Sequence, residues 1–349
     1  MISLCASEVL LRAVFGSVVY LTMPEHQSKE AFFDLRESTL FWQGLFLDGY
    51  RGGEPGFYSQ FAHDADLGWD HRDPIRPHPL PTRPPLFDAS TQRIVTIGDS
   101  FTRGVEVDDD QTFAFHLERQ LEHSRVINLG TAGYGIGQAF LKYLKLGGAL
   151  RPHLLVFGVY EHDLERTRLP FFLSHKPFYY YDPQSEEVRL ERGEIPGFQE
   201  TYDALSDQHA SLNRTSYAYH LLKSHLFPDK EPVFLPEMEA IAEHIFTRLK
   251  VELGRTHTQL LVLHIPSAEH IAAVARQESI APHHERLLGL YRRLRIPYID
   301  LSDAFLKRFS VSEVLEDLYL PSDRGQGHLS PKGHEAVAQI LSEHLAQTL

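Results

Sequence analysis

The chain has 349 residues, enough for one large domain or for one domain with an elaborated extension. Its 42% hydrophobic and 23% charged content is ordinary for a globular protein, while a formal net charge of -13 without any basic run argues against nucleic-acid binding. The single cysteine, Cys5, excludes an internal disulfide bond and a zinc site built from cysteines.

The N-terminal segment, residues 1–23, is apolar but contains Glu8 and Arg12. A membrane span needs about 20 nearly uninterrupted apolar residues, and a signal peptide has a basic start ahead of its apolar stretch. We therefore expect an amphipathic helix packed on the body of a cytoplasmic protein, without membrane association. A trimmed or degenerate anchor, with a periplasmic or secreted location, is the alternative.

The sequence predicts two parts of different character. Residues 45–92 are rich in Gly, Pro, Asp and His, which is typical of an extended segment that wraps over a surface. Regular alternation of strand and helix patterns begins after them. We expect an N-terminal helical and extended segment over residues 1–92, packed on the core, and a main domain over residues 93–349.

Five short runs rich in Val, Ile and Leu predict strands that are buried on both faces, as in a parallel sheet. They are residues 93–100, 125–130, 153–160, 259–267 and 296–302. Apolar residues at helical spacing predict helices within residues 109–123, 236–254 and 332–345. Because strands and helices alternate, the economical fold is a three-layer α/β/α sandwich with a five-stranded, mainly parallel sheet.

Residues 164–235 interrupt this alternation after the third predicted strand. Alternating and aromatic stretches around Asp182 predict an inserted β-hairpin. Among its aromatic residues, Phe172, Tyr179 and Tyr180 are the candidates for binding substrate, either in an apolar cleft or on a lid. A small separate core beneath the insertion is the alternative interpretation.

The candidate catalytic residues stand in loops next to the predicted strands and helices. Ser100 ends the first strand run, at the edge of the sheet where parallel α/β folds carry their chemistry. A serine hydroxyl needs a base within hydrogen-bonding distance, and donors for the oxyanion formed when it attacks a carbonyl. His328, before the last helix, is the candidate base. The backbone N–H groups of Ser100 and Gly133 and the ring N–H of His162 are the candidate oxyanion donors.

These positions resemble the sequence blocks of the SGNH/GDSL hydrolase superfamily over most of residues 93–349. The Gly-Asp-Ser tripeptide ending at Ser100 matches the first block, residues 128–133 match the N-x-x-x-x-G block, and residues 325–334 follow the closing block from His328 onward. The resemblance implies a flavodoxin-like sandwich, no metal or organic cofactor, and Ser100 as the nucleophile. It also implies a serine esterase or acyl hydrolase that acts through a covalent acyl-enzyme.

Two positions depart from the family pattern. The third block, which ends in Asn-Asp in the family, has His162 and Asp163 here. The acid of the triad is expected three residues before His328, where the chain has Gly325. Asp323, five residues before the histidine, is the nearest substitute, and a solvated loop residue that caps a turn is its alternative interpretation.

The expected substrate is a small-molecule, lipid or saccharide acyl ester. The same acyl-enzyme could instead transfer its acyl group to an alcohol, which would make the protein an O-acyltransferase. The altered third block and the displaced acid favour a function of a different class. The protein would then be a non-catalytic relative that binds a ligand in the cleft where the family has its active site. Because Ser100 and His328 are both present in their local contexts, catalysis ranks first. The sequence makes no prediction of the oligomeric state.

Overall fold

The computed structural model describes residues 42–43, 46–47, 50, 56–76, 91–212, 236–278, 282–321 and 327–348. The chain divides into two compact units. Unit 1 comprises Met1–Arg72, Arg168–Phe178 and Leu190–Val233, and unit 2 comprises Asp73–Thr167, Tyr179–Arg189 and Phe234–Leu349. The helix expected over residues 1–23 lies outside the described residues.

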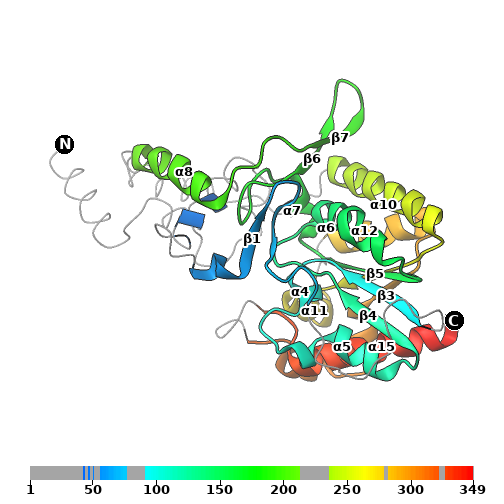
Figure 1. Cartoon of the computed structure of the whole chain (residues 1–349). Coiled ribbons are helices and arrows are strands. Elements are labelled where there is room, and N and C mark those ends of the chain that lie inside the picture. Colours follow the sequence, from blue (N-terminus) through cyan, green and yellow to red (C-terminus); the bar gives the residue numbers. More distant parts are fainter. Residues whose placement is uncertain are drawn as a thin grey trace. The chain divides into compact units, whose positions relative to one another are not determined.

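Within the described part of unit 2, five strands form a sheet in which all neighbours are parallel (Figure 1). The strand order is β4-β3-β5-β8-β9. The strands are β3 Gln92–Ile97, β4 Ser124–Asn128, β5 Leu154–Tyr160, β8 Gln259–Ile265 and β9 Tyr298–Asp300. Six of the seven residues of β5 are buried, as expected for a strand covered on both faces. The five predicted strands and their parallel arrangement are confirmed.

Helices cover both faces of this sheet, α5 and α15 on one side and α6, α10 and α12 on the other (Figure 1). Val156 belongs to the core on the first side. The next residue, Phe157, meets Phe246 of α10 with the ring centroids 5.7 Å apart, because successive side chains of a strand point to opposite faces. The three-layer sandwich is therefore confirmed. Its main helices are α5 Phe113–Gln120, α6 Ile136–Lys142, α10 Pro236–Thr256, α12 Pro282–Leu294 and α15 Pro331–Thr348.

Shorter helical elements complete the described part of unit 2. They are α4 Ser100–Arg103, η3 Asp109–Gln111, η4 Tyr143–Gly147, η5 Gly148–Leu150, α7 Asp163–Arg168, α11 Ala268–Ala275, α13 Leu301–Leu306, α14 Val311–Glu313 and η6 Val314–Leu318. Several of them follow the carboxyl ends of strands. The predicted hairpin is present as a two-stranded sheet of β6 (Phe178–Asp182) and β7 (Glu187–Glu191).

Unit 1 is built around aromatic side chains. Phe46 is buried, and its ring centroid lies 5.1 Å from that of Tyr58 and 5.8 Å from that of Phe171. Phe172 is also buried, with its centroid 3.9 Å from that of Trp42. For Phe172 the structure thus favours the separate-core interpretation over an exposed cleft. The other described elements of this unit are η2 Gly56–Gln60, β1 Phe61–Asp64, β2 Gly68–His71 and α8 Phe198–Leu212.

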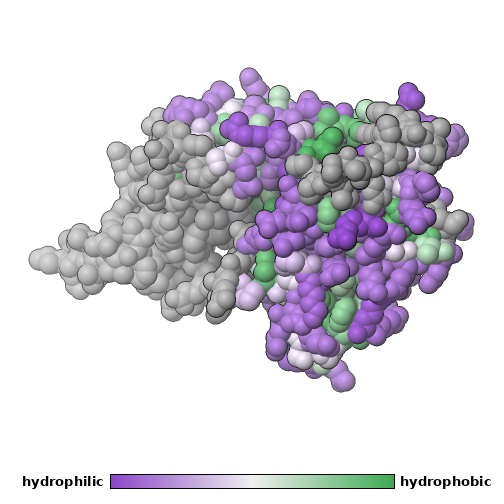
Figure 2. All heavy atoms as spheres, turned by 60° about the horizontal axis from the view of Figure 1, so that its bottom comes forward, coloured by the Kyte–Doolittle hydropathy of each residue, from purple (hydrophilic) through white to green (hydrophobic). Residues whose placement is uncertain are grey.

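The described residues on the face drawn in Figure 2 are mostly hydrophilic, with apolar side chains in small separate patches. Large hydrophobic side chains that are exposed in the described residues include Leu144, at 43%, and Val251, at 49%. Among the described helices, none is both long and apolar enough to cross a bilayer.

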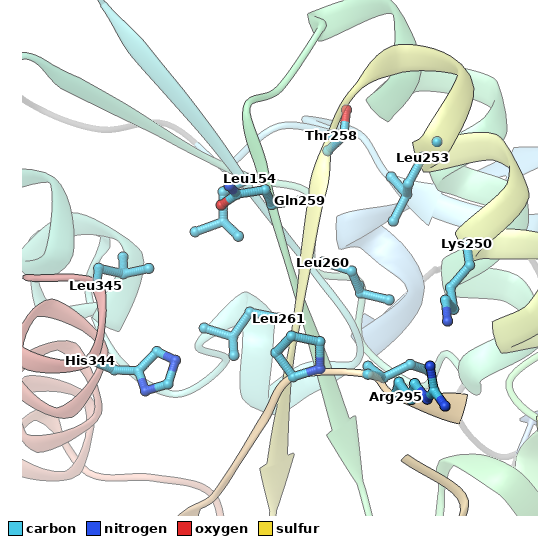
Figure 3. A pocket seen from close by; sticks show the side chains of 13 residues that line it. Leu154, Lys250, Leu253, Thr258, Gln259, Leu260, Leu261, Arg295, His344 and Leu345 are labelled. Atoms are coloured by element: carbon cyan, nitrogen blue, oxygen red, sulfur yellow. The ribbon is translucent and has the colours of Figure 1, made fainter. Parts of the chain in front are cut away.

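A pocket of about 460 Å³ lies at the amino edge of the sheet (Figure 3). Its lining includes Leu154 and Gln259, the first residues of β5 and β8, together with the cationic side chains of Lys250 and Arg295. Ser100, in contrast, follows the carboxyl end of β3. The pocket and the candidate nucleophile therefore lie at opposite edges of the same sheet.

Candidate active site

The loops that follow β3, β4 and β5 meet at the carboxyl edge of the sheet. β3 lies between the other two, because the chain adds β4 on one side and then returns to place β5 on the other. Such a reversal of strand order opens a crevice where α/β sheets bind their ligands. Ser100 follows β3, Gly133 follows β4, and α7 follows β5.

Ser100 is held in a tight turn between β3 and α4. The side chain of Asp99 caps the helix by accepting a hydrogen bond from the N–H of Phe101 at 2.9 Å. Gly98 is required by close packing, because a Cβ atom there would lie 2.6 Å from the carbonyl oxygen of Gly158 and 2.3 Å from the hydroxyl of Thr102. The turn thereby fixes the backbone that carries the serine hydroxyl.

Ser100 and His328 are in direct contact although 228 positions separate them in the chain. The Oγ atom of Ser100 lies 2.8 Å from Nε2 of His328. Both residues are largely buried, and the His328 ring packs edge-on against Phe101, with centroids 4.9 Å apart. The structure therefore brings together the two residues that the sequence singled out as nucleophile and base.

The other ring nitrogen of His328 faces Glu106, a residue that the sequence analysis missed. Its Nδ1 atom lies 2.6 Å from Oε2 of Glu106. A carboxylate that accepts a hydrogen bond from Nδ1–H leaves Nε2 free of a proton and able to accept one from the serine. Asp323, the expected acid, lies outside the described residues. Among the described residues, Glu106 is the carboxylate in contact with Nδ1.

Glu106 lies in a loop with an unusual backbone. Its φ of +69° falls in the left-handed region, which is uncommon for residues other than glycine. Arg76 holds this loop, and its guanidinium is mostly buried, with 12% of the side chain exposed. The guanidinium donates hydrogen bonds to the carboxylate of Asp109 and to the carbonyl oxygens of Arg103, Gly104 and Val107, at 2.6 to 3.0 Å.

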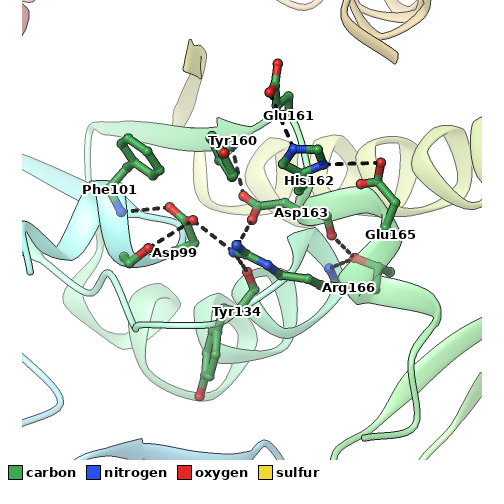
Figure 4. A network of polar contacts seen from close by, with 12 residues as sticks. Asp99, Phe101, Tyr134, Tyr160, Glu161, His162, Asp163, Glu165 and Arg166 are labelled. Carbon is green, nitrogen blue, oxygen red and sulfur yellow. Dashed lines mark hydrogen bonds and ion pairs between the residues drawn. The ribbon is translucent and has the colours of Figure 1, made fainter. Parts of the chain in front are cut away.

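A network of charged side chains includes Asp99, the residue before Ser100 (Figure 4). Arg166 of α7 donates from Nη1 to Oδ2 of Asp99 and to Oδ1 of Asp163, each at 3.0 Å. Asp99 Oδ2 is also 3.3 Å from Ser100 Oγ. Burial raises the pKa of Asp163 well above its usual value, and the negative charge of Asp99 raises it further. For Arg166, burial lowers the pKa, but the two aspartates raise it by more.

His162 lies between two carboxylates (Figure 4). Its Nε2 is 3.4 Å from Glu161, and its Nδ1 is 3.6 Å from Glu165. Burial lowers the pKa of His162, but the neighbouring carboxylates, Glu165 foremost, raise it by more, so that the net pKa lies above the ordinary value. These contacts orient the ring within the α7 region, and its role as an oxyanion donor stays a prediction.

Gly133 lies in a turn formed by Thr131 through Tyr134, where the N–H of Tyr134 donates to the carbonyl oxygen of Thr131 at 3.3 Å. Its φ of +80° is the conformation that the third residue of a type II turn requires, and glycine adopts it without strain. A backbone N–H in this turn can approach a substrate closely, because no Cβ atom is in the way.

The two tyrosines predicted to bind substrate differ in their exposure. Tyr179 is buried, and its ring lies over Gly137 of α6, where an added Cβ atom would come within 2.8 Å of the ring. Tyr180, the next residue of β6, is 36% exposed. The structure therefore favours a packing role for Tyr179, whereas the Tyr180 side chain is accessible to solvent.

In the part of the chain that the structure describes, no group of three or more His, Cys, Asp or Glu side chains is arranged to hold a metal ion. The titratable side chains around Ser100 contact one another instead. The chemistry that this arrangement can perform is that of a hydroxyl, an imidazole and a carboxylate in a row.

No protein-family model matches the chain, and no curated protein does. Solved structures similar to it include LAE5, an α/β hydrolase enzyme from the metagenome of Lake Arreo, at 14% identity and a TM-score of 0.41, covering 74% of this chain and 97% of that one. A catalytic mutant of an acetylxylan esterase from Geobacillus stearothermophilus is 14% identical, with a TM-score of 0.40 and coverage of 72% and 93%. A protein from Desulfitobacterium hafniense that is assigned to a lipolytic G-D-S-L family is 12% identical, with a TM-score of 0.38, and the match covers 72% of this chain and 99% of that one.

Proposed function

We propose that the protein is a serine esterase or acyl hydrolase of the SGNH/GDSL type, which its sequence resembles. The observation that supports this best is the row of contacts from Ser100 Oγ to His328 Nε2, at 2.8 Å, and from His328 Nδ1 to Glu106, at 2.6 Å. These distances lie within the hydrogen-bonding range that a nucleophile and its base require.

In the proposed reaction, Ser100 Oγ attacks the carbonyl carbon of an acyl ester while His328 takes the hydroxyl proton. The tetrahedral intermediate collapses, the bond to the alcohol oxygen breaks, and His328 returns the proton to that leaving oxygen. Water then attacks the acyl-serine ester with His328 as base again, releasing the acid and restoring the hydroxyl of Ser100. Glu106 holds the imidazole in the tautomer that each proton transfer needs and stabilises the charged ring.

The negative charge on the substrate oxygen needs donors that are already in position. We propose the backbone N–H groups of Ser100 and Gly133 for this role. The positive φ of Gly133 and the absence of a side chain there support the assignment. His162 is the third candidate donor.

The proposed substrate is a small acyl ester. If an alcohol accepted the acyl group in place of water, the same residues would catalyse O-acyl transfer, and product analysis with and without an added alcohol distinguishes the two reactions. A panel of acyl esters of increasing chain length measures the size of the acyl group that the site accepts.

Labelling with a fluorophosphonate probe tests the proposal directly. We expect the wild-type protein to be labelled, and Ser100→Ala and His328→Ala to lose ester hydrolysis by a factor on the order of 10⁴ or more. Ser312→Ala, which removes the hydroxyl of an exposed serine, is the matched control and should keep full activity. Labelling that persists in Ser100→Ala would exclude Ser100 as the nucleophile. A well-folded wild-type protein that is not labelled would favour the non-catalytic, ligand-binding alternative.

A further inference from the structure

One nitrogen atom of Arg166 contacts all three loops around the candidate nucleophile (Figure 4). Nη1 donates to Asp99 after β3, to the carbonyl oxygen of Tyr134 after β4 at 3.5 Å, and to Asp163 after β5. The side chain of Arg166 is 13% exposed, and both carboxylates are buried. The cost of removing a guanidinium from water is offset only where its partners are charged and well placed, as they are here.

Asp99 connects this network to Ser100. Its Oδ2 atom, which accepts from Arg166, lies 3.3 Å from Ser100 Oγ. The same Ser100 Oγ lies 2.8 Å from His328 Nε2. A hydroxyl has one proton to donate, so Asp99 and His328 compete for it. A carboxylate oxygen that already accepts from a guanidinium is a weaker acceptor for a second donor. The bond from Arg166 to Asp99 therefore favours donation from Ser100 to His328.

We infer that Arg166 is a positioning residue for the nucleophile: it ties the three loops together and neutralises Asp99, so that the Ser100 hydroxyl points to His328. This inference rests on the proposed function. Without Arg166, the buried carboxylates of Asp99 and Asp163 would have lost the cation they share. Asp99 would then compete with His328 for the hydroxyl proton of Ser100 without a cation to offset its charge.

The test measures the rate of fluorophosphonate labelling at Ser100, together with kcat and KM for an acyl ester. In the labelling step the bond from Ser100 Oγ to phosphorus forms, the phosphorus–fluorine bond breaks, fluoride leaves, and the serine proton passes to His328. We expect Arg166→Gln to lower both the labelling rate and kcat by roughly 10- to 100-fold, with a smaller change in KM.

Two further variants separate charge from packing. Arg166→Lys keeps a cation and should retain more activity than Arg166→Gln. The double variant Arg166→Gln with Asp99→Asn removes the carboxylate that competes with His328 along with the guanidinium, and the asparagine oxygen can still accept from the N–H of Phe101. It should recover part of the loss. Arg255→Gln is the matched control, because Arg255 forms a similar helical pair with Glu252 but is 68% exposed, and it should label at the wild-type rate.

Wild-type rates in Arg166→Gln would overturn the inference. Equal losses in the Lys and Gln variants, or no recovery in the double variant, would also overturn it. Thermal unfolding checks that each variant folds. If Arg166→Gln alone does not fold, a loss above about 100-fold in both Arg166→Lys and the double variant counts against the inference. Failure of the wild type to label at Ser100 would instead refute the proposed function, and that result does not depend on any Arg166 variant.

Discussion

A carboxylate beside the second nitrogen of a catalytic imidazole acts in two ways. It selects the tautomer, and it stabilises the positive charge that the ring acquires during proton transfer. Glu106 can do both for His328 across 2.6 Å. Its backbone φ of +69° costs energy that the surrounding loop must supply, and strain of this kind is concentrated at functional sites. The contact with His328 supports the proposal that Glu106 is the acid of a triad.

Replacing Glu106 separates these contributions. We expect Glu106→Gln, which keeps an oxygen able to accept from Nδ1–H but removes the charge, to lower kcat by on the order of 10²-fold, and Glu106→Ala to lower it by up to about 10⁴-fold. The measurement is steady-state ester hydrolysis. Asp323→Asn is the comparison, since it changes the acid that the sequence suggested, and it should have a much smaller effect. A larger loss of kcat in Asp323→Asn than in Glu106→Gln would indicate that Asp323, and not Glu106, is the acid beside His328.

At the scale of elements, the site depends on the short helix α4 and the loop after it. The last turn of a helix leaves carbonyl oxygens without partners inside the helix. Arg76 donates to two of them, those of Arg103 and Gly104, and to the carbonyl of Val107 just beyond Glu106. One guanidinium thus closes the helix end and fixes the loop that carries the candidate acid. This role places Arg76 with the site although it belongs to a different stretch of sequence.

We expect Arg76→Ala to lower the free energy of unfolding by roughly 2–4 kcal/mol, because it removes several charge-assisted hydrogen bonds that a mostly buried guanidinium makes. It should also lower kcat, since Glu106 would no longer be held against His328. Urea unfolding and ester hydrolysis measure the two effects. Arg72→Ala, at an exposed arginine in the preceding segment, is the control for both. A destabilised Arg76→Ala protein with unchanged kcat would show that catalysis does not require Arg76 to hold the loop that carries Glu106.

The contrast between Ser100 and Arg76 shows which parts of the site a sequence can reveal. Ser100 follows an apolar strand within a recognisable tripeptide. Its position at the carboxyl edge of the sheet, and a histidine base close to it, could therefore be predicted. Arg76 lies in a Gly- and Pro-rich stretch, whose composition predicts only the absence of regular structure. The position of Glu106 depends on a left-handed backbone conformation and on the hydrogen bonds that Arg76 donates to its loop. Neither feature produces a periodic pattern in the sequence. Contacts of this kind arise from tertiary structure, and no local signal in the sequence identified them.

At the scale of the whole molecule, the site is complete only when distant parts of unit 2 meet. His328 lies just before α15, and its backbone carbonyl accepts from the N–H of Leu320 at 2.7 Å. In the same segment, His334 accepts at Nδ1 from the N–H of Phe113, at the start of α5, at 3.2 Å. The two histidines of the closing motif therefore have different tasks. His328 contacts Ser100, while His334 joins the last helix to the first half of the domain.

His334 should make stability depend on pH. Burial, together with the nearby charge of Arg76, lowers its pKa from 6.5 to about 3. In the folded protein the ring stays neutral at pH 5, whereas in the unfolded chain it binds a proton below pH 6.5. Its contribution to stability is thus fully present above that pH and declines as the pH falls toward the folded pKa, by up to about 1.4 kcal/mol per pH unit.

The variant His334→Asn isolates this contribution, because the amide oxygen can accept from the N–H of Phe113 but does not titrate. Between pH 7 and pH 5, we expect the wild type to lose roughly 1–2 kcal/mol more unfolding free energy than the variant. Urea unfolding at both pH values measures the difference, because all other titrating groups are common to both proteins. Equal losses in the two proteins would mean that His334 is not held neutral in the folded state.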